Sequence, residues 1–130
     1  MIINGKNAIL GRLATRVAKE ALKGEEISIV NCEQIVVTGN KEFFKKKLED
    51  KRKRLGTTLS GPKVSRTNEK IVKRAIRGML PNYRVGRGRE AFKRIKCYLG
   101  VPKEFEGKKF ENLEGKTKGK KTQIKEFAKW

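Results

Sequence analysis

The stretch that decides the fold lies in the middle of the chain, where residues 71–102 read IVKRAIRGMLPNYRVGRGREAFKRIKCYLGVP. In the first part of this stretch, apolar residues recur at the three- and four-residue spacing of one helix face. Cations interrupt the stripe at Lys73, Arg74 and Arg77, and Pro81 cannot continue a helix. The pattern therefore predicts a helix that ends before Pro81, with an apolar side for a core and a cationic side.

A turn rich in glycine and arginine follows this predicted helix. Arg84, Arg87 and Arg89 alternate there with glycines, which let the backbone approach a ligand closely. The turn either contacts phosphate and leads into the N-terminus of a helix over residues 89–94, or it is a solvated loop. Tyr83, just before the turn, either stacks on an unpaired base or caps the core.

A strand, a helix and a strand open the chain. Residues 2–3 are a short strand candidate, and residues 9–23 place their apolar side chains at helical spacing. Residues 27–30 and 35–38 are short runs rich in β-branched side chains, which favour strands. A βαβ unit of this kind predicts a right-handed crossover and a parallel sheet, and hence an α/β protein.

The sequence patterns that predict the remaining elements are weaker. Residues 41–54 predict a thin amphipathic helix, which Asn40 can cap. Residues 95–99 either continue the preceding helix or alternate as a fourth strand, and the abrupt Gly-Val-Pro ending favours the strand. Residues 103–122 show no clear period and predict an extended basic arm over the surface. Three apolar residues after it indicate a last short helix: Ile124, Phe127 and Trp130.

Positive charge is unevenly distributed along this chain, whose net charge is +20. Residues 1–40 carry a net charge of +1, residues 41–62 of +5, residues 63–102 of +10 and residues 103–130 of +4. The front of the chain is therefore interpreted as a scaffold for a cationic middle. Self-repulsion of this size implies a counter-charged partner, with nucleic acid the first candidate and an anionic membrane surface the second.

The type of cation differs between the middle and the tail. Residues 63–102 contain seven arginines, whereas residues 103–130 contain nine lysines and no arginine. Guanidinium groups fit phosphate with two parallel hydrogen bonds and stack on bases, whereas an ammonium group acts as a hydrated point charge. The middle is therefore expected to make geometrically defined contacts, and the tail to add diffuse attraction.

Several classes of site are disfavoured by what the sequence lacks. It contains no histidine, the commonest metal ligand and general base, and its carboxylates are few and scattered. Cys32 and Cys97 lie far apart without CxxC spacing, so neither a disulfide nor a zinc site is expected. We predict no metal and no cofactor. No apolar run resembles a signal peptide or approaches the length of a membrane span, so a cytosolic protein without a membrane partner is expected.

A Rossmann-like nucleotide-binding enzyme is the alternative that the βαβ opening suggests. Gly5 and Gly11 flank the start of the first predicted helix, but their spacing follows neither GxGxxG nor the P-loop pattern. A turn glycine and a packing glycine explain them more simply. The basic helices also lack the Trp-, Phe- and Leu-rich faces of helices that lie on membranes.

Several motifs together resemble one known family. They are IRGMLP at 76–81, GREAFKRIKCYLGVP at 88–102, LGRLAT at 10–15, VNCE at 30–33 and VTG at 37–39. This set is similar to the thirteenth ribosomal protein family of the large subunit, in its archaeal and eukaryotic form. The resemblance covers about residues 1 to 105. It implies a three-layer α/β/α domain around a four-stranded, mainly parallel sheet, and direct binding of large-subunit ribosomal RNA early in assembly, without catalysis.

These observations predict a structural protein of the cytoplasmic ribosome. Residues 1–102 are expected to form a single RNA-binding domain, and residues 103–130 a basic extension packed on the surface or on RNA. The predicted partners are large-subunit ribosomal RNA and neighbouring ribosomal proteins, with no small-molecule substrate. The predicted RNA contacts are the following cations: Arg12, Arg16, Lys63, Arg66, Lys73, Arg74, Arg77, Arg84, Arg87 and Arg89.

Overall fold

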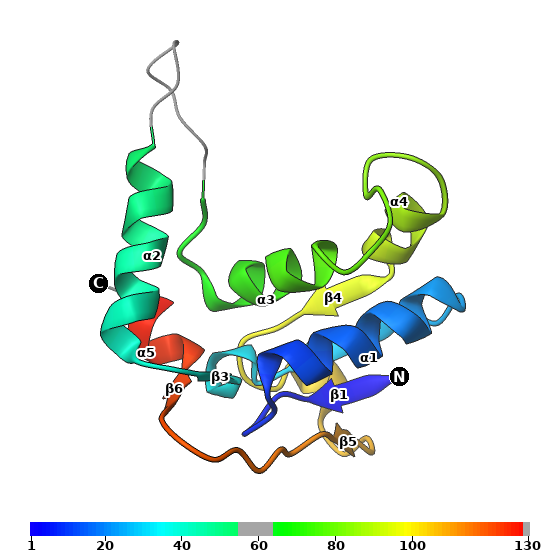
Figure 1. Ribbon diagram of the computed structural model, residues 1–130. Helices are drawn as coiled ribbons and strands as arrows, with labels where there is room; N and C mark the ends of the chain where they lie inside the picture. The colour runs from blue at the N-terminus through cyan, green and yellow to red at the C-terminus, as the bar shows by residue number, and fades with distance from the viewer. Residues whose placement is uncertain (55–63, 129–130) are drawn as a thin grey trace.

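The computed structural model describes residues 1–54 and 64–128 of the protein. Within them, four parallel strands form the main sheet, in the order β4-β2-β1-β5 (Figure 1). The strands are β1 (Ile2–Asn4), β2 (Ile27–Val30), β4 (Ile95–Cys97) and β5 (Glu111–Asn112). This sheet and its helices confirm the predicted α/β class, with three layers around a four-stranded parallel sheet.

Helix α1 (Leu10–Leu22) makes the predicted crossover between β1 and β2. Its Leu13 and Val17 are fully buried, as are Ile3 of β1 and Ile29 of β2. Side chains of this size, removed from water, each contribute about 1.5–3 kcal/mol to folding. The nearly neutral front of the chain is therefore the hydrophobic scaffold that its composition indicated.

One of the four strands that the sequence predicts, at residues 35–38, does not join the main sheet. Strand β3 (Val36–Thr38) exists, but it pairs antiparallel with β6 (Lys121–Gln123) in a separate two-stranded sheet. The fourth place is taken by β5, at the edge next to β1, where Ile3 pairs with Glu111. Such an edge position needs only main-chain hydrogen bonds, so a polar pair of residues without a strand pattern fills it.

Three helices follow β3, and their ends agree closely with the sequence. Helix α2 (Lys41–Lys53) spans the predicted range, and α3 (Asn68–Arg77) ends before Pro81. Helix α4 (Gly86–Lys93) begins three residues earlier than predicted, and its first residue, Gly86, has a positive φ of 61°, the left-handed conformation through which the chain enters the helix from the turn. The prediction that the segment after α4 forms a strand is confirmed by β4.

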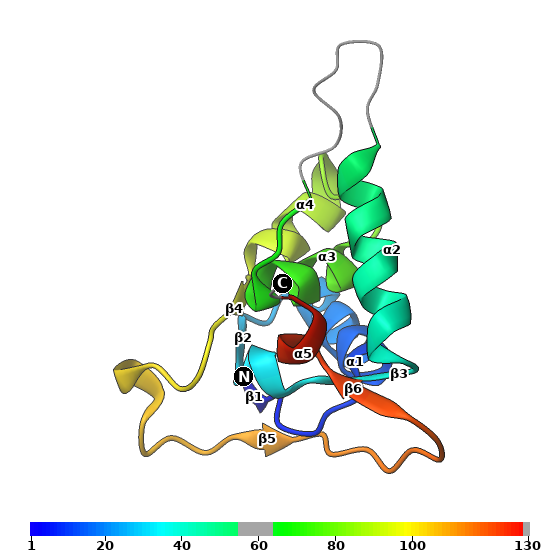
Figure 2. The same cartoon turned by 90° about the vertical axis from the view of Figure 1, so that its left-hand side faces the viewer.

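The C-terminal part returns to the core. Helix α5 (Ile124–Ala128) forms as predicted, with Ile124 and Phe127 buried; Trp130 lies outside the described residues. The Phe127 ring lies 5.4 Å from that of Phe44 on α2. Figure 2 shows the segment that carries β5 running along the base of the molecule to β6, with α5 beside α2. The C-terminal segment therefore packs against the N-terminal end of α2.

Three basic helices form one concave side. In Figure 1, α3 lies across the molecule, and α2 and α4 rise at its two ends. Helix α3 also packs on α1, so its other side is left for the concavity. Among the described residues, no helix is both long and apolar enough to cross a membrane.

Candidate nucleic-acid interface

Helix α3 separates apolar from cationic side chains as its periodicity predicted. Val72 and Ile76 are fully buried, whereas Lys73, Arg74 and Arg77 remain at least partly accessible to solvent. The apolar side fixes the helix on the core, so its backbone holds the three cations at defined positions. Glu69 in the first turn and Arg77 in the last also suit the helix dipole.

Two aromatic rings, one in the turn and one on α4, gather cations from α3 and from the turn. The guanidinium carbon of Arg77 lies 4.6 Å from the centre of the Tyr83 ring, and that of Arg84 lies 5.5 Å from it. The ammonium nitrogen of Lys73 lies 4.8 Å from the centre of the Phe92 ring, and the two rings are 6.2 Å apart. We call these five residues the cation–aromatic cluster. It holds three positive charges close together without a carboxylate.

The Tyr83 hydroxyl takes part in the same cluster. Arg84 Nε donates a hydrogen bond to the Tyr83 hydroxyl oxygen at 3.3 Å. This hydrogen bond and the positive charge of Arg84 lower the pKa of the Tyr83 phenol, with smaller contributions from Arg77 and Arg74. The shift shows that the local electrostatic potential is positive and stabilises anions.

The turn before α4 is held close to the end of α3 by a glycine. A Cβ atom at Gly88 would collide with the backbone oxygens of Pro81 and Asn82. The first turn of α4, which carries Arg87 and Arg89, therefore sits directly against the Pro81 turn. Both arginines are exposed, and neither has an ion-pair partner in the part of the chain that the structure describes.

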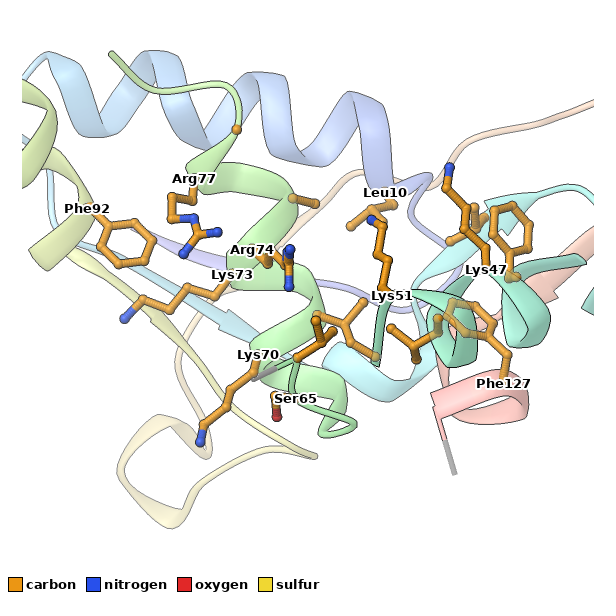
Figure 3. A pocket seen from close by; sticks show the side chains of 17 residues that line it. Leu10, Lys47, Lys51, Ser65, Lys70, Lys73, Arg74, Arg77, Phe92 and Phe127 are labelled. Atoms are coloured by element: carbon orange, nitrogen blue, oxygen red, sulfur yellow. The ribbon is translucent and has the colours of Figure 1, made fainter. Parts of the chain in front are cut away.

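A groove of about 600 Å³, the α2–α3 groove, lies between α2 and α3 (Figure 3). Its floor is apolar, and no aspartate or glutamate lines it. Burial and the neighbouring charges of Arg74, Lys47 and Arg54 lower the pKa of Lys51. The groove is therefore an uncompensated cationic site. The cations that line it are Lys47, Lys51, Lys70, Lys73, Arg74 and Arg77.

The sequence did not identify Lys47, Lys51 or Lys70 as site residues, although all three line this groove. Lys47 and Lys51 are four residues apart on α2, so they share one side of that helix. From this spacing, the shared position of the two lysines on one side of α2 could have been predicted. The packing of α2 and α3 on α5, which brings Lys51 near Arg74, was not visible in the sequence.

The predicted arginines of α1 lie elsewhere. Arg16 forms ion pairs with Glu20 on its own helix, at 3.8 Å, and with Glu111 of β5, at 3.1 Å. Arg12 lies near Gly115, in the segment that follows β5. Both side chains thus face the β5 edge of the sheet, and the structure does not join them to the cation–aromatic cluster.

Arg66 occupies a third location. It lies in the segment before α3, beside the end of α2, and lines a hollow of about 370 Å³ with Glu49, Arg52 and Lys53. Lys63, the remaining predicted contact, lies outside the described residues. Of the ten predicted cations, the structure joins four to the groove or the cation–aromatic cluster, namely Lys73, Arg74, Arg77 and Arg84, and it leaves Arg87 and Arg89 exposed in the first turn of α4.

The sequence of this chain matches a family of known proteins. The family model described as ribosomal protein L13 matches residues 1–104. The chain belongs to the ribosomal protein L13 family. The resemblance drawn from the sequence motifs is thereby confirmed.

Archaeal members of the L13 family are similar over most of this chain. The large ribosomal subunit protein uL13 of Methanocaldococcus jannaschii is 49% identical over 107 residues, which cover 80% of this chain and 77% of that protein. Its namesake from Methanococcus maripaludis is 50% identical over 105 residues, covering 78% and 76%. That of Archaeoglobus fulgidus is 42% identical over 113 residues, covering 87% and 71%.

Membership of the L13 family shows whether the protein is a ribosomal protein or an enzyme. Its members are structural proteins of the cytoplasmic ribosome, so the predictions of a ribosomal location and of no enzymatic activity are confirmed. The Rossmann-like enzyme is set aside on the same ground. In the described residues no group of histidine, cysteine or carboxylate side chains is arranged to hold a metal ion.

Proposed function

We propose that this L13-family protein is a structural constituent of the large ribosomal subunit, that it binds ribosomal RNA directly, and that it supports early subunit assembly. Its relatives carry the name of the large subunit. The observation that carries the proposal is the concave side between α2 and α4, where a groove with six cations and no carboxylate adjoins the cation–aromatic cluster.

The chemistry of this side fits a phosphate backbone. Arg74 and Arg77 on α3 offer guanidinium forks, which bind phosphate oxygens with two hydrogen bonds. Arg84, Arg87 and Arg89 continue the line of positive charge through the turn and along α4. Because helical RNA hides its base edges in a deep groove, binding through phosphates selects the shape of the folded RNA and its exposed loops.

The other predicted cations are proposed as additional contacts from different directions. Arg66 stands beside the end of α2, and Arg12 and Arg16 face the β5 edge. Lys63 completes the proposed set. An RNA that touches all of them surrounds the protein on more than one side, as is expected for a protein embedded among ribosomal RNA and neighbouring ribosomal proteins.

The division of labour along the chain is also a proposal. Residues 1–102 carry the concave side and are proposed to be the RNA-binding domain. Residues 103–130 are proposed to act as a basic extension that packs on this domain through β5, β6 and α5, and whose exposed lysines add salt-sensitive attraction to RNA.

Direct RNA binding is tested by replacing the two arginines at the centre of the concave side. Full-length protein is titrated against transcribed large-subunit ribosomal RNA in a filter-binding assay at several salt concentrations. Arg74→Ala with Arg77→Ala is expected to weaken binding and to lower the slope of log affinity against log salt by about 1.5, because two phosphate contacts are lost. Lys6→Ala with Lys19→Ala removes the same charge from exposed positions at the front of the chain and serves as control.

The two double variants separate a defined site from general attraction. If both lose affinity and slope equally, net charge alone governs binding and the concave side is not the site. The assembly role is tested by reconstituting large subunits with and without the protein. Particles that sediment identically in its absence would contradict that part of the proposal.

A further inference from the structure

The α2–α3 groove differs from the rest of the concave side because it combines a cationic rim with an apolar floor. Leu10, Phe44, Ile71 and Phe127 contribute to that floor, from α1, α2, α3 and α5. Figure 3 shows Leu10 and Phe127 with Lys47 and Lys51 at one part of the groove, and Lys73, Arg77 and Phe92 at another. A phosphate backbone alone would use the rim and leave the floor empty.

The rim carries charge that the protein does not compensate. Lys51 and Arg74 face each other across the groove, and their proximity helps to lower the pKa of Lys51. In the described lining the side chains that could accept a hydrogen bond are limited to the Ser65 hydroxyl. A ligand must therefore bring both anionic oxygens for the rim and a flat or apolar group for the floor.

We propose that the α2–α3 groove receives one unpaired nucleotide of the bound RNA, with its base on the apolar floor and its phosphate between Lys51 and Arg74. This inference rests on the proposed function, since it assigns a pocket within the RNA-binding side. A base has a flat face for the aromatic and aliphatic floor, and it carries its phosphate a short distance away. The groove thus reads an unstacked base, whereas the rest of the concave side reads shape.

Continuity with the cation–aromatic cluster favours a nucleotide over an acidic segment of a neighbouring protein. Lys73, Arg77 and Phe92 line the groove and also belong to the cluster. A strand of RNA that lies along the cluster therefore passes the mouth of the groove. An acidic peptide would need to displace that strand from the shared cations.

The test fills the groove without changing charge. Ala75 is half-buried in the lining, so Ala75→Phe places a ring where the base would lie. Gly11→Phe is the control, because that helical position is exposed and a Cβ atom there meets nothing within 4 Å. The wild-type protein and both variants are bound to large-subunit ribosomal RNA, irradiated with ultraviolet light, and digested for mass spectrometry of nucleotide adducts.

We expect the wild-type protein and Gly11→Phe to carry a nucleotide adduct on a peptide that includes Phe44 or Phe127. Ala75→Phe should lose this adduct and bind RNA about five- to a hundredfold more weakly, which is the effect of losing one stacked base. Its salt slope should fall by at most about 1, because no more than the one phosphate contact between Lys51 and Arg74 is lost with the base. Lys51→Met, compared with Lys53→Met on the same helix, tests the phosphate side without filling the groove, and should weaken binding more than its control.

The outcomes distinguish this inference from the proposed function. If Ala75→Phe and Lys51→Met both bind as their controls do, while Arg74→Ala with Arg77→Ala still weakens binding, the pocket is overturned and RNA binding stands. If Ala75→Phe instead loses a cross-link to another protein in reconstituted subunits, the occupant is a protein segment and the inference is overturned. If the wild-type protein does not bind the RNA, the proposed function fails first.

Discussion

The guanidinium group of Arg77, at the end of α3, lies against the ring of Tyr83, in the turn that leads to α4, with 4.6 Å between the guanidinium carbon and the ring centre. Arg84 approaches the same ring at 5.5 Å. Two like charges on separate elements are thus held near one another by one aromatic side chain, whose negative faces offset their repulsion. The ring thereby links the geometry of α3 to that of the turn.

Tyr83 is expected to position both arginines for RNA. Tyr83→Leu removes the ring and should weaken binding to large-subunit ribosomal RNA about three- to tenfold, since each exposed cation–π contact contributes about 0.5–1 kcal/mol. Tyr83→Phe keeps the ring and should stay within about twofold of wild type. In a double-mutant cycle with Arg77→Ala, the two losses should not add. Fully additive losses would show that Tyr83 contacts the RNA independently of Arg77.

The phenol of Tyr83 reports the same electrostatics without RNA. Its pKa is lowered from 10.0 by the hydrogen bond and the charge of Arg84. Arg84→Ala should therefore raise the pKa of Tyr83, because the phenolate loses the donor that stabilises it. Ultraviolet titration in a Tyr98→Phe background, which leaves Tyr83 as the one tyrosine, measures this directly. An identical titration curve with and without Arg84 would contradict the geometry of the cluster.

Gly88 allows α4 to approach the turn at Pro81 and Asn82 closely. A methyl group there would lie 2.5 Å from the Asn82 oxygen, so Gly88→Ala should lower the free energy of unfolding by about 1–3 kcal/mol through overpacking. Gly11→Ala is the matched control. It lies in α1 with open space around it, and should stabilise the protein by about 0.5–1 kcal/mol through helix propensity. Urea unfolding of both variants gives the comparison, and equal effects would argue against the close approach.

The helices were predictable because each one carries its own periodic pattern. Helix α1 buries Leu13 and Val17, and α3 buries Val72 and Ile76, at the spacing read from the sequence. Which strands join the main sheet was harder to predict from the sequence, because main-chain pairing between distant segments decides it. Val36–Thr38 has the composition of a sheet strand yet pairs with β6, whereas Glu111–Asn112 has no strand pattern yet completes the main sheet.

The candidate site was predictable in part for the same reason. Arg74 and Arg77 lie on the cationic side of a helix whose apolar side the sequence defined. Arg12 and Arg16 have an equally clear helical pattern, but the C-terminal segment that faces them could not be inferred from it. The lysines of the α2–α3 groove were missed because their position in the site depends on how α2 packs. That packing is set by the contact between Phe44 of α2 and Phe127 of α5, two residues far apart in the sequence.

Arg94 and Arg87 should separate stability from RNA binding. Arg94 Nη1 donates a hydrogen bond to the Ala21 oxygen at 3.1 Å and Arg94 Nη2 lies 3.8 Å from Glu90, so it joins α4 to α1. Arg94→Ala should cost about 1–2 kcal/mol of stability and leave the RNA affinity of the folded protein unchanged. Arg87→Ala removes the same charge from an exposed position, so it should weaken RNA binding and alter stability by less than about 0.5 kcal/mol. Calorimetry and filter binding on both variants test the pair, and the reverse result would exchange the two roles.

The two cysteines should differ in reactivity. Cys32 is fully buried and Cys97 is half-buried, and a hydrogen bond between their thiols together with burial raises the pKa of Cys32 far above its usual range. Because thiolates are the reactive species, Cys97→Ala, which retains Cys32, should react with iodoacetamide at pH 8 at least tenfold more slowly than Cys32→Ala, which retains Cys97. Burial, which remains when Cys97 is replaced, keeps Cys32 slow in the folded variant, and in guanidinium chloride the two rates should become equal because unfolding exposes both thiols. Equal rates in the folded variants would mean that Cys32 is open to solvent and that the core beside β4 is looser than the structure indicates.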